Sequence, residues 1–344
     1  MDYGIALTPS PTSWKTVQRA EELGFSYAWF YDSQLLYTDV FVAMALAAEH
    51  TSRIKLATGV LIPTNRIAPV AASGFASLNA LAPGRIIFGV GTGFTGRNTM
   101  GLPAQKLAGM DEYIGVVRTM LRGGTAEFHT EGTMRRARFL NPENGMLNVT
   151  DGVPVHVSAF GPRAMRLAAQ AGDGWVTFAG NPGRARQQLA DFSAACERQG
   201  KDASAFYKTT FSLGCVLGEG EPADGPRAIA QAGPGVAVGW HGMVERAKAA
   251  GTPIPEPQAS LYESYEPADA RYLSLHRGHL LFVRDDERQF VGGDAIRATT
   301  FTGTAAELKE RARAMEAAGF DQLTIQLIYG HEDAVEDWAK VLLG

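Results

Sequence analysis

A series of glycines follows one of the most apolar segments of the chain. Residues 84–93 read Gly-Arg-Ile-Ile-Phe-Gly-Val-Gly-Thr-Gly. A continuous apolar run of this kind is typical of a strand buried on both faces in a parallel sheet or barrel. Glycine has no Cβ, so glycines at the end of such a strand let the backbone approach a ligand closely. Gly91, Thr92 and Gly93 are therefore candidate cofactor-binding residues.

The same segment also fits the dinucleotide-binding pattern G-x-G-x-x-G, from Gly91 to Gly96. That pattern holds a pyrophosphate only where a helix opens at its third glycine. Gly101 and Pro103 follow closely, and they predict a loop over residues 93–108. The pattern is therefore weak support for a dinucleotide site.

A candidate anion site lies at residues 158–163, Ser-Ala-Phe-Gly-Pro-Arg. A strand is predicted over residues 154–158, and Pro162 suits the first turn of a helix. Free N–H groups at the helix start, the helix dipole, Ser158 and Arg163 would converge on a phosphate, with Ala159, Phe160 and Gly161 between them. An ordinary strand-to-helix turn with a solvated arginine explains the same pattern equally well.

The candidate acid–base residues are one aspartate and two histidines. Asp32 follows an aromatic strand, where it could bond a ring nitrogen or cap a turn at Ser33. His276 and His279 are three residues apart and could share a helix face, one packed and the other facing solvent or substrate. No third ligand accompanies them, so no metal site is expected. His156 lies within a predicted strand and is expected to line the core.

The ends of the other predicted strands carry small residues and few reactive groups. The candidate positions there are Asp32, Thr58-Gly59-Val60, Gly91–Gly93, Ser158–Gly161 and Gly180. No metal-ligand cluster, carboxylate pair or Ser-His-Asp set is evident among them. Such a site suits a planar cofactor that carries the chemistry itself.

The elements that position these residues repeat along the chain. A helix, a glycine and an apolar strand follow one another at residues 13–31, 166–178 and 307–327, which predicts alternating helices and parallel strands. Counting the other predicted strands gives eight β/α units. We therefore predict a (β/α)8 TIM barrel with its site at the C-terminal strand ends; an open doubly wound sheet is the alternative.

The alternation of strands and helices stops at residues 218–302, between the seventh strand and the seventh helix. This glycine- and proline-rich stretch is predicted to contain short helical pieces, and its length suggests a lid or substrate-side insertion within a single domain, residues 1–344. It concentrates tyrosines and histidines suited to holding an organic substrate, with His279 and His276 as the first candidates.

Composition narrows the function further. The chain has 344 residues, a net charge of −4 and two cysteines, so neither nucleic-acid binding nor a disulfide framework is expected. The longest apolar run, residues 40–48, is too short to span a bilayer. No basic segment followed by an apolar one begins the chain, so we expect a cytoplasmic protein without a membrane anchor.

Several segments together resemble the bacterial luciferase-like family of flavin- and deazaflavin-dependent oxidoreductases. The matching segments are Ala20–Phe25 leading to Asp32, Thr51–Val60, Arg66–Pro69, Leu78–Leu81 with Gly84-Arg85, the glycines at 89, 91 and 93, and Ser158–Pro162. The detailed pattern, with Asp32-Ser33-Gln34, is similar to the methylenetetrahydromethanopterin reductase-like branch. The resemblance covers the first half of the chain continuously and returns at Gly303–Leu327.

The resemblance implies a TIM barrel that binds a flavin at its C-terminal face, often as a homodimer. It places a bulged third strand, sometimes with a cis peptide, at Gly59-Val60 beneath the flavin ring. Ser158–Arg163 would hold the phosphate, and Gly91–Gly93 would lie along the ribityl chain. The family often has Asp-His after the second strand, whereas Asp32-Ser33 stands here, so a histidine at that point cannot transfer a proton.

The resemblance favours a monooxygenase that takes reduced FMN from a separate flavin reductase and oxygenates a small organic substrate. The alternative is a reductase or dehydrogenase that moves hydride to or from the deazaflavin coenzyme F-420. A barrel that binds flavin without turnover is a third possibility, and its hallmark would be a truncated substrate side.

Overall fold

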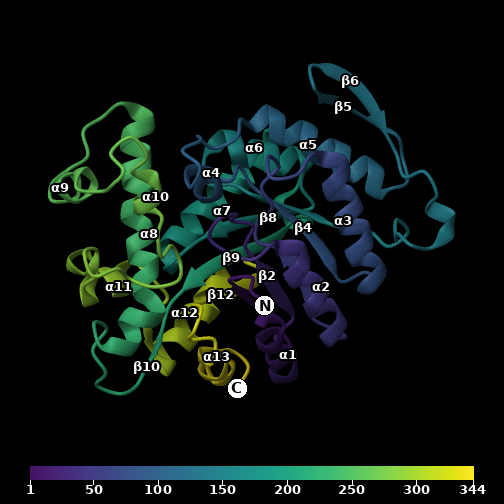
Figure 1. Ribbon diagram of the computed structural model, residues 1–344. Coiled ribbons are helices and arrows are strands. Elements are labelled where there is room, and N and C mark those ends of the chain that lie inside the picture. Colours follow the sequence, from purple (N-terminus) through teal and green to yellow (C-terminus); the bar gives the residue numbers. More distant parts are fainter.

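The fold is a closed barrel of eight parallel strands. The computed structural model describes residues 1–344. Around the barrel the strands follow the order β1-β12-β9-β8-β7-β4-β3-β2, and β2 pairs with β1 to close it (Figure 1). The barrel strands are β1 Asp2–Leu7, β2 Tyr27–Phe30, β3 Lys55–Thr58, β4 Ile86–Val90, β7 Val155–Ser158, β8 Gly174–Phe178, β9 Tyr207–Leu213 and β12 Gln322–Leu327. The predicted (β/α)8 barrel is confirmed.

Helices connect these strands and surround the barrel (Figure 1). They are α1 Ser13–Leu23, α2 Val40–His50, α3 Ala68–Leu81, α5 Leu107–Leu121, α6 Pro162–Ala171, α7 Pro182–Glu197, α12 Ala305–Ala318 and α13 Ala334–Leu342. Short 3-10 turns occupy Pro142–Asn144, Ala203–Ala205 and Arg288–Phe290. After α5 the chain forms an antiparallel hairpin of β5 Ala126–Thr130 and β6 Thr133–Ala137.

The helix–glycine–strand units form as the sequence predicts because glycine can end a helix in the left-handed conformation. Gly24 after α1 has φ 103° and Gly319 after α12 has φ 111°, and each donates its N–H to carbonyl groups of the last helical turn. At the third copy Gly172 has φ −91° instead. There a Cβ would lie 2.7 Å from the carbonyl oxygen of Ala168, so close packing requires the glycine.

Aromatic side chains fill the barrel interior. Trp29 on β2 packs edge-on against Phe211 on β9, with ring centroids 5.2 Å apart. His156 on β7 is 4% exposed and lies against Trp29 and Tyr207, which confirms that it lines the core. Burial lowers the pKa of His156 to about 4, so its imidazole is neutral at physiological pH.

The insertion between β9 and α12 has more regular structure than we predicted. It contains β10 Val216–Leu217, α8 Pro226–Ala250, α9 Gln258–Glu263, α10 Tyr272–Leu275, α11 Gly293–Thr299 and β11 Gly303–Thr304. Figure 1 shows its helices stacked along one side of the barrel. The expectation of only short helical pieces is wrong, because α8 has 25 residues and includes Pro234.

Close packing explains the glycines within α8. A Cβ on Gly233 would lie 2.8 Å from Val283, and one on Gly235 would lie 3.1 Å from Leu213 of β9. The two glycines therefore let neighbouring segments pack closely against α8. This tertiary packing outweighs the low helix propensity of glycine. The expected loop over residues 93–108 also differs, since it begins with the short helix α4 Phe94–Asn98.

No helix of the structure combines the length and the apolar composition needed to cross a bilayer.

The contact between β3 and β4 generates a test of fold stability. A Cβ on Gly89 would lie 1.9 Å from the carbonyl oxygen of Thr58, so Gly89→Ala must push the two strands apart. We expect it to lower the free energy of unfolding by at least about 1–3 kcal/mol in urea titrations. The control is Gly115→Ala in α5, where a Cβ would meet nothing within 4 Å; it should stabilise the chain by about 0.5–1 kcal/mol. Equal stability of the two variants would contradict the strand contact.

Candidate functional site

The predicted site residues outside the insertion lie along one arc of the barrel rim. They follow β2, β3, β4, β7 and β8, which are consecutive neighbours in the barrel. Parallel strands all end on the same face, so these segments meet at the C-terminal mouth. The exposed or partly exposed members are Gly59, Val60, Thr92, Gly93, Ser158, Phe160, Gly161, Arg163 and Gly180.

The chain turns sharply at the end of β3. The peptide bond between Gly59 and Val60 is cis, as the family resemblance implied for this position. Thr58 is fully buried, and its hydroxyl donates to the carbonyl oxygen of Gly89 at 2.6 Å. The side chain of Thr58 is thus bonded to β4, whereas Gly59 and Val60 reach the partly exposed rim.

The glycines after β4 are required by contacts within the protein. A Cβ on Gly91 would lie 2.6 Å from Cγ2 of Val60, and one on Gly93 would lie 2.4 Å from Cγ2 of Ile62. Gly93 also has φ 71° and caps the start of α4. Our interpretation that these glycines leave room for a ligand needs correction, because the space for each Cβ is filled by the segment after β3. A cofactor would meet their backbone instead.

The start of α6 is open to an anion. Gly161 is its N-cap residue and makes no side-chain cap, and Pro162 is the first helical residue. The N–H groups of Arg163 and Ala164 have no acceptor in the protein. A Cβ on Gly161 would meet nothing within 4 Å, so a cradle lies before this helix. These features suit a phosphate group.

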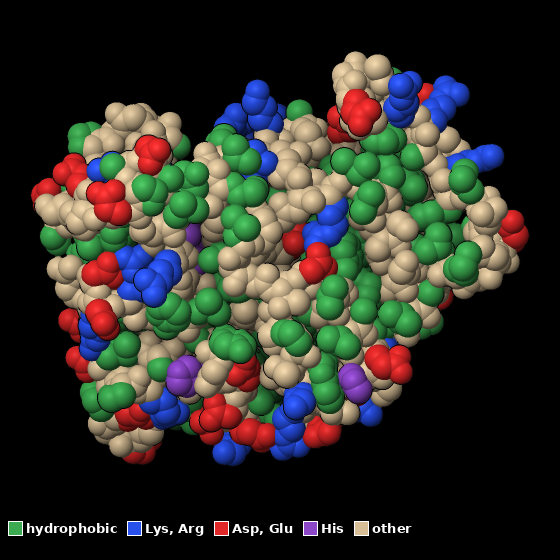
Figure 2. Space-filling model, in the orientation of Figure 1, with side chains coloured by type: hydrophobic (Ala, Val, Ile, Leu, Met, Phe, Trp, Pro, Cys, Tyr) green, Lys and Arg blue, Asp and Glu red, His purple; other side chains and the backbone are tan.

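Exposed arginines lie at the start of α6 and at the start of the neighbouring helix α7. Arg163 in α6, and Arg184 and Arg186 at the start of α7, are exposed and pair with no carboxylate within 4 Å. Neither helix has an acidic residue in its first turn. Figure 2 shows basic side chains gathered at the upper edge of the molecule, near α6 and α4. An acidic ligand would therefore be attracted to this part of the rim.

Two exposed aromatic rings border the same cradle. Phe160 and Phe178 follow β7 and end β8, and their ring centroids are 5.5 Å apart. They are 50% and 39% exposed, so together they offer an apolar surface to which a flat ligand could bind. Ala159 is buried, and its carbonyl accepts from the Trp175 indole at 2.9 Å.

Gly180 lies where the barrel meets the insertion. A Cβ there would lie 2.6 Å from the carbonyl oxygen of Thr299 at the end of α11. The carbonyl group of Gly180 accepts a hydrogen bond from the Arg311 guanidinium, which also bonds the carbonyl groups of Thr300 and Thr302. Its observed contacts are structural, and cofactor binding by Gly180 stays a prediction.

Asp32 organises the loop after β3. Its carboxylate accepts from the Ile62 N–H at 2.9 Å, from the Asn65 amide at 3.2 Å and from Arg66 at 3.1 Å. Burial raises the pKa of Asp32, and the Arg66 charge and these donors oppose that rise. The carboxylate thus holds the loop after Gly59-Val60 in place; a direct part in catalysis stays a prediction.

The two histidines of the insertion do not share a helix face. His276 is the residue after α10, and His279 follows Gly278, which has φ 79° and turns the chain. Both are buried, at 2% and 5% exposure, so neither reaches bulk solvent. The prediction of a shared helix face is therefore wrong, because α10 ends before His276. A contact of either ring with substrate stays a prediction.

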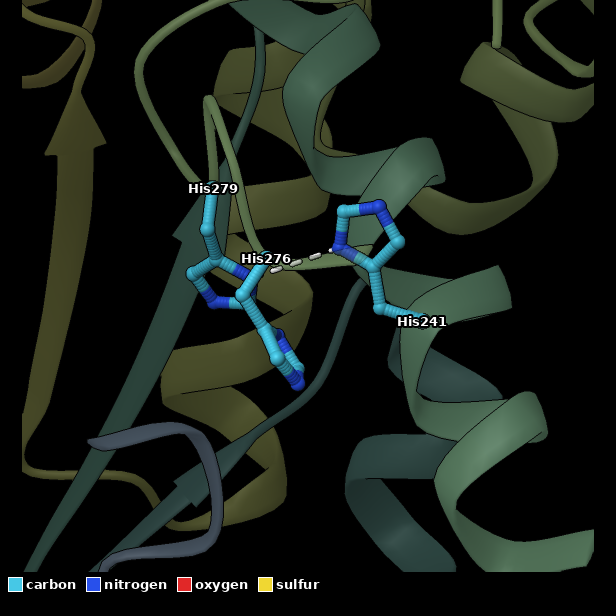
Figure 3. A group of neighbouring side chains, drawn as sticks. All are labelled: His241, His276 and His279. Carbon is cyan, nitrogen blue, oxygen red and sulfur yellow. Dashed lines mark hydrogen bonds between the residues drawn. The ribbon is translucent and has the colours of Figure 1, made fainter. Parts of the chain in front are cut away.

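A third histidine joins them, which the sequence analysis missed. His241 from the middle of α8 is 2% exposed, and its Nδ1 lies 3.4 Å from Nδ1 of His279 (Figure 3). Thirty-five residues separate His241 from His276 in the chain, so no local spacing signals the cluster. The only hint was a histidine inside an apolar helix.

Each ring has a polar neighbour on its outer side. Nε2 of His241 lies 2.7 Å from the Glu287 carboxylate, and Nε2 of His279 lies 3.3 Å from the Thr95 hydroxyl. Nε2 of His276 lies 3.5 Å from the Glu245 carboxylate, but neither nitrogen of His276 makes a hydrogen bond. Burial lowers the pKa of His241 to about 3 and raises that of Glu287 to about 7.

The loop that carries His279 rests on the barrel mouth. The next residue, Leu280, has φ 55° and packs against the aromatic group inside the barrel. The Tyr37 hydroxyl, in the segment after β2, donates to the carbonyl oxygen of His279. The histidine cluster therefore lies on the side of the insertion that faces the strand ends. A cofactor is predicted to bind at those strand ends.

A closed parallel barrel with an anion cradle, exposed aromatic rings and a covering insertion on one rim defines a TIM-barrel protein, and the chemistry of this rim suits a flat, anionic ligand. The model of the luciferase-like monooxygenase family matches residues 14–322. The chain belongs to that family.

Curated relatives are named as reductases and dehydrogenases. The chain is 30% identical over 207 residues to 5,10-methylenetetrahydromethanopterin reductase from Methanolobus tindarius, covering 59% of this chain and 61% of the relative. It is also 30% identical over 221 residues to the F-420-dependent hydroxymycolic acid dehydrogenase of Mycobacterium tuberculosis, covering 60% and 59%. The matches thus span about three fifths of the relatives' lengths.

Solved structures share the whole fold. The coenzyme F-420-dependent tetrahydromethanopterin reductase from Methanopyrus kandleri superimposes with a TM-score of 0.73 at 20% identity, covering 99% of this chain and 98% of that one. The FMN complex of the oxygenating constituent of 3,6-diketocamphane monooxygenase from Pseudomonas putida gives 0.66 at 14% identity, covering 99% and 95%. At these identities the likeness concerns the fold alone.

The buried pair of Asp32 and Arg66 provides a test of how the rim is held. Asp32→Asn removes the charge that Arg66 and the Ile62 N–H bond, and we expect the free energy of unfolding to fall by about 1.5–3 kcal/mol. The control Glu336→Gln breaks an exposed ion pair with Arg19 and should change stability by less than about 1 kcal/mol. Chemical denaturation measures both, and an Asp32→Asn effect as small as the control would argue against this role.

Proposed function

We propose that this protein is an oxidoreductase that moves hydride between an organic substrate and the deazaflavin coenzyme F-420, bound at the C-terminal mouth of the barrel. The observation that carries the proposal is the open, arginine-flanked start of α6 beside the exposed rings of Phe160 and Phe178. The names of curated relatives that are F-420-dependent dehydrogenases support this coenzyme over FMN.

The residues of the rim fit such a coenzyme. When bound, a deazaflavin supplies a ring carbon that accepts or releases hydride. The N–H groups of Arg163 and Ala164 would bind its phosphate, and the Arg163 side chain would add a charged contact. The coenzyme continues beyond its phosphate into an acidic tail, which Arg184 and Arg186 would attract. Gly59 and Val60 would support the ring, and Asp32 would hold that support through the loop it bonds.

The insertion would supply the substrate side. The barrel rim offers backbone groups and aromatic faces, which position a flat molecule but distinguish poorly between substrates. Residues 218–302 add aromatic and polar side chains from α8 to α11, and the loop with Leu280 closes on the barrel interior. The substrate is therefore expected to be a small organic molecule held between the coenzyme and this insertion.

The second candidate is the FMN-dependent monooxygenase favoured by the family resemblance, with reduced FMN supplied by a separate reductase. The name of the matching family and the fold of an FMN-bound monooxygenase support it. FMN ends at its phosphate. If FMN is the cofactor, Arg184 and Arg186 would have no anionic group to bind.

A titration of both coenzymes against the purified protein separates the two candidates. Binding is followed by the quenching or shift of the fluorescence of F-420. We expect the Kd for F-420 to be lower than the Kd for FMN in either oxidation state, because three arginines without a carboxylate partner favour the more acidic ligand. Binding of reduced FMN without binding of F-420 would reject the proposal in favour of oxygenation. Binding of neither would reject both candidates.

The helix start at Gly161 allows cofactor binding to be separated from stability. Gly161→Asp places a carboxylate on the free N–H groups of α6, and its backbone angles, φ −108° and ψ 163°, suit an aspartate cap. We expect the melting temperature to stay equal or rise slightly. The same carboxylate would occupy and repel the phosphate site, so the Kd for F-420 should increase about 10–100-fold, equivalent to the loss of charged hydrogen bonds worth about 1.5–3 kcal/mol.

The matched control is Gly292→Asp at the start of α11. Gly292 is also an uncapped N-cap residue, with φ −112° and ψ 164°, and a Cβ there meets nothing within 4 Å. This variant gains the same cap away from the α6 cradle and should bind coenzyme like wild type. If both variants bind normally, the phosphate lies elsewhere.

A further inference from the structure

The three buried histidines form a group that the proposed coenzyme chemistry does not require. Each of His241, His276 and His279 offers one ring nitrogen, and the three nitrogens lie within 4.8 Å of one another (Figure 3). Burying an imidazole ring is costly unless its nitrogens make hydrogen bonds or bind a metal ion. His276, however, is 2% exposed and neither of its ring nitrogens has a hydrogen-bond partner.

On two of the rings the outer partner leaves Nδ1 free. Glu287 lies next to Nε2 of His241 and Thr95 lies next to Nε2 of His279. Neither nitrogen of His276 makes a hydrogen bond, and the Glu245 carboxylate lies 3.5 Å from its Nε2. An outer carboxylate or hydroxyl that fixes one ring nitrogen is the usual arrangement behind a metal-binding histidine. Nδ1 of His241, Nδ1 of His279 and one nitrogen of His276 therefore remain as possible ligands.

The spacing of two of these atoms matches a metal site better than a direct hydrogen bond. Nδ1 of His241 and Nδ1 of His279 are 3.4 Å apart, which is long for a nitrogen–nitrogen hydrogen bond. Two ligands bound at about 2.0–2.1 Å to one tetrahedral Zn²⁺ ion lie about 3.3–3.4 Å apart. With Nε2 of His241 donating to Glu287, its Nδ1 presents a lone pair toward His279.

We propose that His241, His276 and His279 bind one divalent transition-metal ion, with Zn²⁺ as the best fit, and that the ion fastens the insertion to the barrel mouth. Three neutral nitrogen ligands suit Zn²⁺ and its borderline neighbours rather than Mg²⁺ or Ca²⁺, which prefer oxygen. A rotation of the His276 ring would close the remaining gap, and the fourth position would take a small oxygen ligand.

The position of the site explains why an ion there would hold the insertion on the barrel mouth. His241 comes from α8, and the other two histidines come from the loop after α10. His279 contacts Thr95 of α4 through its ring and Tyr37 through its carbonyl group. An ion bound to all three rings would therefore connect two parts of the insertion and hold them on the segments after β2 and β4.

Metal binding is tested on the full-length protein after treatment with a chelator. The apoprotein is titrated with Zn²⁺ in competition with a chromophoric chelator, and with Co²⁺, whose visible absorption reports a tetrahedral site. We expect one equivalent of either ion to bind, with the Co²⁺ spectrum of a nitrogen-rich tetrahedral site. Substoichiometric Zn²⁺ binding by the folded wild-type protein would overturn the proposal.

Variants assign the ligands. His276→Ala should weaken Zn²⁺ binding at least 100-fold, while His156→Ala removes a buried histidine outside the cluster and should keep full binding. Glu287→Gln retains all three ligands but loses the carboxylate behind His241, and we expect affinity to fall about 10–100-fold. Near-ultraviolet circular dichroism checks that each variant is folded. Wild-type affinity in both His276→Ala and Glu287→Gln would place any bound metal elsewhere.

Amide hydrogen exchange tests separately whether the ion holds the insertion on the barrel mouth. Zn²⁺ should slow amide hydrogen exchange in residues 272–282 and 93–98 of wild type but not of His276→Ala, and it should do so without any coenzyme present. Stoichiometric Zn²⁺ with unchanged exchange in these segments would refute the fastening role. These measurements do not involve F-420 or FMN, so their result is independent of the proposed function.

Discussion

The close contact between the ends of β3 and β4 is the constraint on which the rest of the rim depends. The Thr58 hydroxyl bonds the Gly89 carbonyl at 2.6 Å, and a side chain at Gly89 would overlap the Thr58 carbonyl. Farther along, Val60 and Ile62 fill the spaces beside Gly91 and Gly93. Small residues on β4 therefore let the segment after β3 lie flat across the barrel mouth, where Asp32 then bonds it. A side chain on any of these glycines would lift the support that a flat cofactor needs.

The insertion is held on this rim by buried polar groups as well as by apolar packing. Leu280 packs on the aromatic interior, while His241, His279 and Glu287 are nearly inaccessible to water. Burying such groups is costly unless each is satisfied, so a buried polar cluster specifies one arrangement of the insertion over the mouth. This arrangement brings side chains with reactive nitrogen and oxygen atoms to a rim that otherwise offers backbone and aromatic faces.

The barrel could be predicted from sequence because its signals are local. A helix, a glycine and a β-branched strand each have a short-range cause, as at Gly24 and Gly319, and the start of α6 is readable from Gly161-Pro162. The histidine cluster could not be predicted, since His241 and His276 meet only through tertiary packing. The long helix α8 was missed for a related reason: Gly233, Pro234 and Gly235 break helices in isolation, and here they permit close contact with β9 and the loop at Val283.

The burial of His279 restricts its chemistry. Burial and the neighbouring His241 and His276 hold its pKa well below the usual value for histidine, so the ring is neutral at physiological pH and cannot serve as a stored proton donor. Thr95 occupies its Nε2, and the Tyr37 hydroxyl bonds its carbonyl group. A neutral ring of this kind can accept a proton, pass one along a hydrogen-bonded chain or bind a metal ion. Because Glu287 has a pKa raised to about 7 by burial, it is the group of this cluster able to carry a proton near neutral pH.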